Sequence, residues 1–207
     1  VRYPYLDFST LEKRHRACAR ELEINSPNAP QIYKRLAAIT REPDGRLAFD
    51  GRGAVIEWAV QMARFREVDV LANRISCSPL TTEEAKLLAD AVYDSHLRAA
   101  VLEKPPREAS TANVAAGVLA ALPSLFAPAD QALIEVLTAR LTAFVADVQP
   151  LLTHRASEGH VRRCHGDLHL ANIVLLDGAP TLFDAIEFDE TLAATDTLYD
   201  LAFLLMD

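Results

Sequence analysis

The sequence has few cysteines: Cys18, Cys77 and Cys164 are the only three among 207 residues. They are widely separated, show no metal-site spacing, and cannot all be paired because their number is odd. The sequence therefore gives no support for a disulfide framework or a cysteine-based metal site. This usage favours a reducing compartment, so we expect the protein to be cytoplasmic.

Long apolar runs and dense basic clusters are also absent. No stretch approaches the length of a membrane-spanning helix and no signal peptide is visible, so we expect no membrane partner. The net charge is −8, and the basic run 13–16 lies among acidic residues on an expected helix, which indicates a solvated surface. Nucleic acid is therefore not an expected partner. An acidic protein can attract a cationic substrate, although net charge alone does not locate a cleft.

The remaining composition is that of an ordinary globular protein. Hydrophobic residues make up 50% of the chain and charged residues 24%, with no internal repeat or low-complexity segment. This length suits one large domain or two small ones. The chain begins with Val1 rather than Met and stops at Asp207 within an apolar helical pattern, so we expect a fragment of a longer protein.

The most informative stretch is 163–188, where polar residues alternate with short apolar runs. His165-Gly166-Asp167-Leu168-His169-Leu170-Ala171-Asn172 precedes an apolar run, an Asp177-Gly178 pair, and a second run that ends at Asp184. Asp followed by Gly supplies the positive φ angles of a tight hairpin turn, so the runs 173–176 and 179–183 are predicted to pair as strands. The hairpin would carry Asp184 back toward Asp167 and Asn172.

These three residue types suit the chemistry of magnesium and nucleotides. Mg²⁺ prefers oxygen ligands and takes only one or two carboxylates from a protein. Asn172 and Asp184 fit that ligand set and leave Asp167 free to face a nucleophile. Phosphoryl transfer needs mainly positioning and charge stabilisation of this kind.

The same stretch allows a second interpretation. His165, Asp167 and His169 alternate along the chain and carry donor types found around zinc in metal-dependent hydrolases. No further histidine follows His169, however, to complete such a site.

The spacing from His165 to Asn172 resembles the catalytic loop H-R-D-L-x-x-x-N of protein kinases. The Gly after His165 and the later Tyr199-Asp200-Leu201-Ala202 resemble the aminoglycoside phosphotransferase and choline kinase-like family. That resemblance implies that Asp167 accepts the proton of a substrate hydroxyl and that Asn172 and Asp184 hold Mg²⁺ on ATP. Ala185-Ile186 replaces the Phe-Gly of protein kinases, which argues against an activation-loop switch.

The resemblance also implies supporting roles. His165 would pack under the loop and bond to its backbone, and Asp200 would brace the loop through backbone amides. Glu187 resembles the Glu of the Asp-x-x-Glu form and would be a partner of the metal or of the loop. His169 replaces a Lys of protein kinases, and it would either contact phosphate or substrate, or brace the loop.

The first part of the chain resembles an incomplete kinase N-lobe. Ser9 and Glu12 have the spacing of a capping box, which predicts a helix to about residue 24. By resemblance this helix supplies a Glu that pairs with a strand Lys; Glu21 is the best-placed candidate and Glu23 the second. The Lys and the phosphate loop should precede the helix, but 1–6 contain neither.

Three strands are expected next, at 31–41, 47–50 and 54–62. By resemblance the last strand enters the hinge, where the adenine edge would meet backbone groups near Gln61, Met62 and Ala63. A short helix is expected at 66–74. A capping box of Thr81 and Glu84 opens a long helix at 82–102 with an apolar stripe that includes His96, which we interpret as structural.

Three Ala- and Leu-rich helices are expected at 111–122, 129–148 and 151–157, with breaks at Pro123, Pro128 and Pro150. A helical insertion before the catalytic loop is where this family varies and where substrate contacts are expected. A short strand is expected at 161–164.

We therefore predict an α+β, protein kinase-like fold, with a partial N-lobe of helix and antiparallel strands over 1–63 and a mainly helical C-lobe over 64–207. The expected function is transfer of the γ-phosphoryl group of ATP to a small-molecule hydroxyl, with Mg²⁺ as cofactor. The resemblance points to a bacterial subgroup whose members are sometimes joined to a P-loop kinase domain. A pseudokinase or nucleotide-sensing module is the main alternative.

Overall fold

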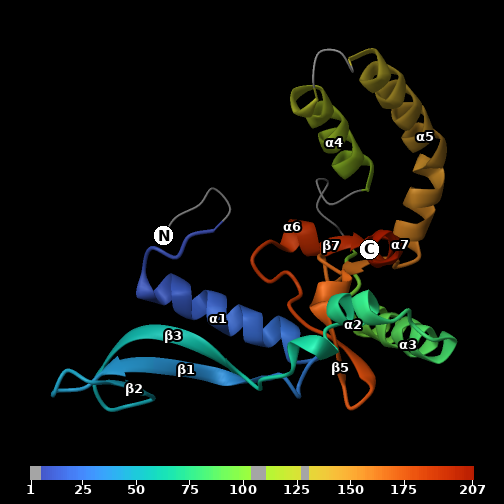
Figure 1. Ribbon diagram of the computed structural model, residues 1–207. Coiled ribbons are helices and arrows are strands. Elements are labelled where there is room, and N and C mark those ends of the chain that lie inside the picture. The colour runs from blue at the N-terminus through green and yellow to red at the C-terminus, as the bar shows by residue number, and fades with distance from the viewer. Residues whose placement is uncertain (1–5, 104–110, 127–130) are drawn as a thin grey trace.

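The computed structural model describes residues 6–103, 111–126 and 131–207. A small antiparallel sheet with one helix forms one side of the molecule, and a mostly helical part with a β-hairpin forms the other (Figure 1). The fold is thus α+β with small antiparallel sheets, as expected.

The first sheet contains β1 (Tyr33–Arg41), β2 (Leu47–Phe49) and β3 (Ala54–Met62) in the order β2-β1-β3. Helix α1 (Leu11–Asn25) lies against β3 and β1 (Figure 1). Cys18 and Trp58 join the two layers, because the thiol contacts the Trp58 carbonyl oxygen at 3.7 Å. The Trp58 ring also packs on the His15 ring in a T-shaped arrangement, with ring centroids 4.3 Å apart. All three predicted strands are present close to the expected bounds.

The start of α1 differs from the prediction by one residue. The N-cap is Thr10, whose hydroxyl accepts the backbone N–H of Lys13 at 3.2 Å. The expected capping box of Ser9 and Glu12 is therefore wrong. Ser9 and Thr10 are both competent caps, so local sequence alone does not choose between them.

The helical part begins with the 3₁₀ turn η1 (Glu67–Asp69), α2 (Leu71–Cys77) and α3 (Thr82–Arg98). The predicted capping box at Thr81 and Glu84 is confirmed, with each residue accepting the backbone N–H of the other. Helix α3 ends at Arg98, four residues before the predicted end.

The two proline breaks expected within the described helices are wrong. Pro123 lies inside α4 (Thr111–Leu125), and Pro150 lies inside α5 (Gln131–Ser157), so the expected helices 129–148 and 151–157 are one helix. A proline removes one backbone donor from a helix, but the neighbouring turns of α5 keep it continuous. Pro128 lies outside the described residues. The two helices pack on each other and project from the rest of the molecule (Figure 1).

The C-terminal segment carries the hairpin. Strand β4 (Val161–Arg163) leads into the loop and the 3₁₀ turn η4 (Leu170–Asn172), which β5 (Ile173–Leu176) and β6 (Ala179–Leu182) follow. Asp177 and Gly178 both have positive φ, which confirms the predicted tight turn. Helix α6 (Glu190–Ala193), β7 (Ala194–Asp196) and α7 (Thr197–Met206) complete the chain, and β7 pairs antiparallel with β4.

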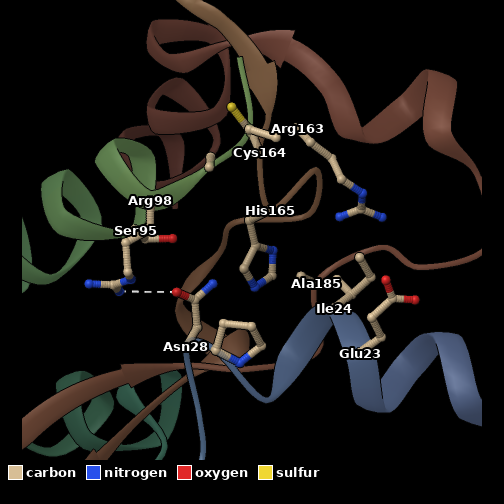
Figure 2. Close-up of a pocket in the computed structure, with 12 residues that line it drawn as sticks. Glu23, Ile24, Asn28, Ser95, Arg98, Arg163, Cys164, His165 and Ala185 are labelled. Atoms are coloured by element: carbon tan, nitrogen blue, oxygen red, sulfur yellow. Dashed lines mark hydrogen bonds between the residues drawn. The ribbon is translucent and has the colours of Figure 1, made fainter. Parts of the chain in front are cut away.

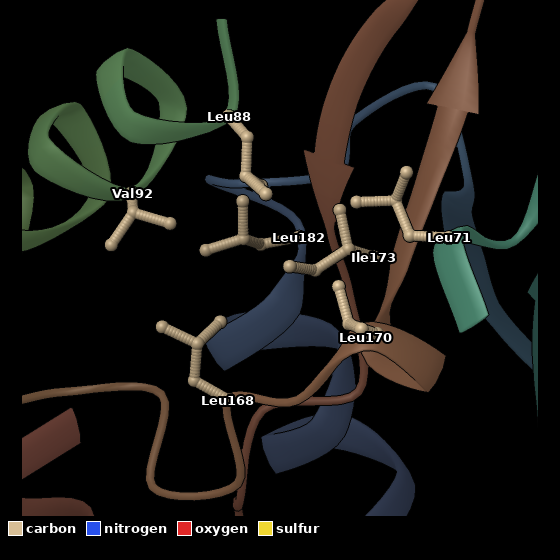
Figure 3. Close-up of a cluster of buried hydrophobic side chains, with 7 residues drawn as sticks. All are labelled: Leu71, Leu88, Val92, Leu168, Leu170, Ile173 and Leu182. Atoms are coloured by element: carbon tan, nitrogen blue, oxygen red, sulfur yellow. The ribbon is translucent and has the colours of Figure 1, made fainter. Parts of the chain in front are cut away.

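A buried apolar cluster fixes the loop and the hairpin to the helices. It joins side chains from α2, α3, η4 and both hairpin strands (Figure 3): Leu71, Leu88, Val92, Leu168, Leu170, Ile173 and Leu182. Leu168 is 0% exposed although it lies in the loop. Burial of one such side chain contributes about 2 kcal/mol, so the residues beside it are held in place. Within the described ranges, no helix combines the length and apolarity needed to cross a membrane.

Candidate functional site

The loop after β4 brings Asp167, His169 and Asn172 together. The Asn172 side-chain amide donates to the Asp167 carbonyl oxygen at 2.9 Å and lies 3.3 Å from its carboxylate. His169 Nδ1 accepts the Ala171 N–H at 3.2 Å, and its Nε2 lies 3.4 Å from the Asp167 carboxylate and 3.3 Å from the Asn172 side-chain nitrogen. This geometry gives His169 a bracing contact with Asp167, which is one of the two roles expected for it.

Gly166 permits the tight turn at the start of the loop. Its φ is +82°, and a Cβ atom there would lie 3.2 Å from Ile186 and 3.3 Å from the Ala193 backbone. A side chain is therefore disfavoured by the backbone conformation and by the tight space around the position. This explains why Gly stands between His165 and Asp167.

Asp200 braces the same loop from α7. Its carboxylate is 1% exposed and accepts the backbone N–H groups of Gly166 at 2.8 Å and His165 at 3.4 Å. His96 Nε2, from α3, lies 2.9 Å from the same carboxylate. The structure thus places Asp200 where the sequence predicted it. His96 was expected to be structural, but its link to Asp200 could not be deduced from its helix position.

The hairpin returns the chain to Asn172. The Phe183 N–H donates to the Asn172 carbonyl oxygen at 3.0 Å, so Asp184 follows directly after a contact with the loop. Asp184 has φ of 61°, which Asp tolerates better than most residues. Its carboxylate is exposed and has no hydrogen bond or ion pair with any residue in the described part of the chain.

Backbone groups on either side of Asp184 are held by α1 and β1. Tyr33 accepts the Asp184 N–H at 3.2 Å through its hydroxyl. Asn25, 1% exposed, accepts the Ala185 N–H at 2.7 Å and donates to the Ala185 carbonyl oxygen at 3.4 Å. Sequence reasoning missed both residues, because their partners lie 151 and 160 positions away and leave no local signal.

Glu21 and Glu187 share a negatively charged region with Asp184. Burial, followed by the charges of Glu187 and Asp184, raises the pKa of Glu21. Burial also raises the pKa of Glu187, with a further contribution from Asp184. Glu23 is instead exposed and paired with Arg20 at 2.8 Å. The structure therefore favours Glu21 over Glu23 as the helix carboxylate of the site.

Replacing Glu21 by Gln is expected to stabilise the metal-free protein at pH 7. A carboxyl whose folded pKa is raised binds its proton more tightly in the folded state, so stability falls as pH rises above the unfolded value near 4.5. The gain is on the order of 1 kcal/mol after allowance for partial exposure. It should disappear below that pH, where both states are protonated.

Thermal unfolding of wild type and Glu21→Gln between pH 3 and pH 8 measures this difference. Glu135→Gln, at an exposed position on α5, is the matched control. A Glu21→Gln protein that is less stable than wild type at neutral pH would show that Glu21 has a compensating cationic partner.

The predicted hinge residues lie at the end of β3. Met62 pairs with Tyr33, and the Ala63 N–H already donates to the Ile32 carbonyl oxygen at 2.7 Å. The backbone N–H of Ala63 is thus already used within the sheet side of the molecule. Phe65 packs on Phe183, with ring centroids 5.1 Å apart, so this segment contacts the residue before Asp184. An open cavity runs beside it, lined by Met62, Ala63, Arg64, Phe65, Arg66 and Glu67.

The zinc-hydrolase ligand set is not assembled. His165 points its Nε2 at the Phe183 carbonyl oxygen, 2.9 Å away. Among the described residues, the group with metal-ligand spacing is His96, Cys164 and Asp200, which contains none of the three expected ligands. Burial raises the pKa of the Cys164 thiol, which disfavours the thiolate that a metal would need. The Asp200 carboxylate already accepts two backbone N–H groups of the loop.

Comparison with known proteins finds relatives but no described activity. The chain is 30% identical to the uncharacterized protein Rv2004c of Mycobacterium tuberculosis and to the uncharacterized protein Mb2027c of Mycobacterium bovis. Each match covers 98% of this chain and 40% of the relative, so the chain spans about two fifths of the length of these relatives. No family model matches, and no solved structure matches.

Proposed function

We propose that the site is a magnesium- and ATP-dependent phosphotransferase centre in a protein kinase-like fold, which transfers the γ-phosphoryl group to a hydroxyl of a small molecule. The observation that carries this proposal is that Asn172 contacts Asp167 through its side chain and is hydrogen-bonded through its backbone to Phe183, the residue before Asp184. Asp200 and the buried Leu168 hold the loop in that geometry.

The donor set fits a magnesium ion. The Asp184 carboxylate is exposed and free of partners among the described residues. The side-chain nitrogen of Asn172 donates a hydrogen bond to the Asp167 carbonyl oxygen, which leaves its side-chain oxygen available as a metal ligand. One carboxylate and one amide oxygen, with water completing the shell, suit Mg²⁺. When bound, the ion would neutralise charge on the phosphate oxygens.

Asp167 would take the proton of the acceptor hydroxyl. Its carboxylate contacts Asn172 and His169 and forms no ion pair with an Arg or Lys in the described part of the chain. As the proton moves to Asp167, the acceptor oxygen bonds to the γ-phosphorus and the bond to ADP breaks. The role is that of a positioned general base.

Calorimetric titration of Mg·ATP into the longest expressible form of the protein tests the proposal. Wild type should bind the nucleotide only with Mg²⁺ present. Asp184→Asn should weaken that binding at least tenfold, because the substitution removes the charged ligand. Asp177→Asn is the matched control, since it is the same substitution in the turn of the same hairpin.

Two outcomes would contradict the proposal. One is no binding of Mg·ATP by wild type. The other is equal binding by wild type and Asp184→Asn. An acceptor screen is justified once magnesium-dependent binding is established. The mycobacterial relatives are longer than this chain. We propose that the additional length in proteins of this kind includes a P-loop kinase domain.

A further inference from the structure

The backbone around Asp184 is hydrogen-bonded to both sides of the molecule. Phe183 donates its N–H to the Asn172 carbonyl oxygen at 3.0 Å, on the helical side. Ile186 donates its N–H to the His165 carbonyl oxygen at 2.9 Å, on the same side. The two N–H groups between them donate to side chains of the sheet side, so all four consecutive backbone donors are satisfied.

The two acceptors on the sheet side are Tyr33 and Asn25. The Tyr33 side chain is 3% exposed, and its hydroxyl accepts the Asp184 N–H at 3.2 Å. The Asn25 side-chain oxygen accepts the Ala185 N–H at 2.7 Å. Figure 2 shows Ala185 next to Ile24 near the end of α1, where both line a cavity of about 200 Å³. The segment that follows Asp184 therefore lies against the end of α1.

These contacts determine the direction of the Asp184 side chain. Two rigid peptide planes flank its Cα atom, and one carries the Asp184 N–H while the other carries the Ala185 N–H. Each plane is bound by one residue of the sheet side, so the φ and ψ angles between the planes are restricted. The φ angle of Asp184 is 61°, in the left-handed region, which a residue other than Gly keeps only where the surrounding structure imposes it.

We propose that Tyr33 is a positioning residue of the metal site, because its hydroxyl holds the Asp184 backbone in the conformation that directs the carboxylate toward the ion. This inference rests on the proposed function, in which Asp184 is the charged ligand of Mg²⁺. Tyr33 acts through the backbone of Asp184 and does not itself bind the metal.

Tyr33→Phe isolates the role of the hydroxyl. The ring belongs to a buried apolar cluster with Ile32, Val70 and Val174, and the variant keeps that packing. We expect it to weaken Mg·ATP binding in calorimetric titrations about tenfold, equivalent to about 1.4 kcal/mol, which is the size of one hydrogen bond. Tyr93→Phe, the same substitution at an exposed position on α3, is the matched control and should bind as wild type does.

Amide hydrogen exchange in the metal-free protein gives a local readout that does not depend on nucleotide. In Tyr33→Phe the Asp184 amide should exchange about tenfold faster than in wild type, because its acceptor is lost. The Phe183 and Ile186 amides should keep their wild-type rates, since their acceptors are carbonyl groups of the loop. A general loss of stability would instead accelerate all three.

A double-mutant cycle shows whether Tyr33 acts through Asp184. In the Asp184→Asn background, Tyr33→Phe should change Mg·ATP binding less than twofold, because the charged ligand that the hydroxyl positions is already absent. An equal loss in both backgrounds would show that Tyr33 acts independently of Asp184, and the inference would be overturned.

Equal Mg·ATP affinity of wild type and Tyr33→Phe, or an unchanged exchange rate of the Asp184 amide, also overturns the inference. These results leave the proposed function standing, because that depends on binding by wild type and on its loss in Asp184→Asn. If wild type does not bind Mg·ATP, the proposed function fails and the metal-site role of Tyr33 fails with it.

Discussion

Asp167→Asn is expected to reduce phosphoryl transfer by about 10²–10⁴-fold while leaving the affinity for Mg·ATP largely unchanged. Loss of a positioned general base has an effect of this size. The amide that replaces the carboxylate still offers an oxygen to the Asn172 side chain, which donates to that position at 3.3 Å. The loop geometry should therefore survive, and only the proton acceptor is removed.

The measurement is the rate of ADP release with a hydroxyl acceptor from the screen, alongside calorimetric binding of Mg·ATP. Asp177→Asn again serves as the control, since it lies in the hairpin turn away from the three site residues. If Asp167→Asn transfers phosphate at the wild-type rate, Asp167 is not the base. Loss of both binding and transfer would instead indicate that the loop has collapsed.

Asp200→Ala is expected to destabilise the protein by about 3 kcal/mol. The substitution removes a carboxylate that is 1% exposed and leaves the His165 and Gly166 N–H groups and the His96 ring without their acceptor. Unsatisfied buried donors cost about 1–3 kcal/mol, and breaking a buried charged contact costs about 3–5 kcal/mol. Part of this loss is recovered where water reaches the cavity left behind.

Urea denaturation of wild type, Asp200→Ala and His96→Ala measures these free energies of unfolding. His96→Ala should cost less than Asp200→Ala, because both backbone amides keep their acceptor. Asp90→Ala, an exposed position on the same α3 helix as His96, should change stability by less than about 0.5 kcal/mol. An Asp200→Ala protein as stable as wild type would show that the loop does not depend on α7.

Features determined by neighbouring residues could be predicted from the sequence. The Thr81–Glu84 capping box and the Asp177-Gly178 turn each depend on contacts within four residues, and both form as expected. The one-residue error at the start of α1 arises because two adjacent residues can cap a helix. The predicted break at Pro150 is wrong, because α5 is long enough to lose one backbone hydrogen bond and continue.

Features determined by distant partners could not be predicted. Strand β7 is only three residues long and exists through its pairing with β4. Asn25 and Tyr33 bind the backbone around Asp184 from the other side of the molecule. The contact between His165 Nε2 and the Phe183 carbonyl oxygen joins the loop to the far end of the hairpin. Each of these needs the tertiary structure, because nothing in the adjacent sequence marks it.

The hydrogen bonds between Asn25 and Ala185 have a consequence for domain motion. Asn25 ends α1 on the sheet side, whereas Ala185 follows the hairpin on the helical side, and the side-chain amide bonds both polar groups of that residue. Any motion that separates the sheet side from the helical side must break these two hydrogen bonds. Each bond contributes about 1 kcal/mol to the free energy that holds the two sides together. Since Ala185 is next to Asp184, such an opening would pull directly on the backbone that holds the metal ligand we propose. Release of product and loosening of the metal would then be one event.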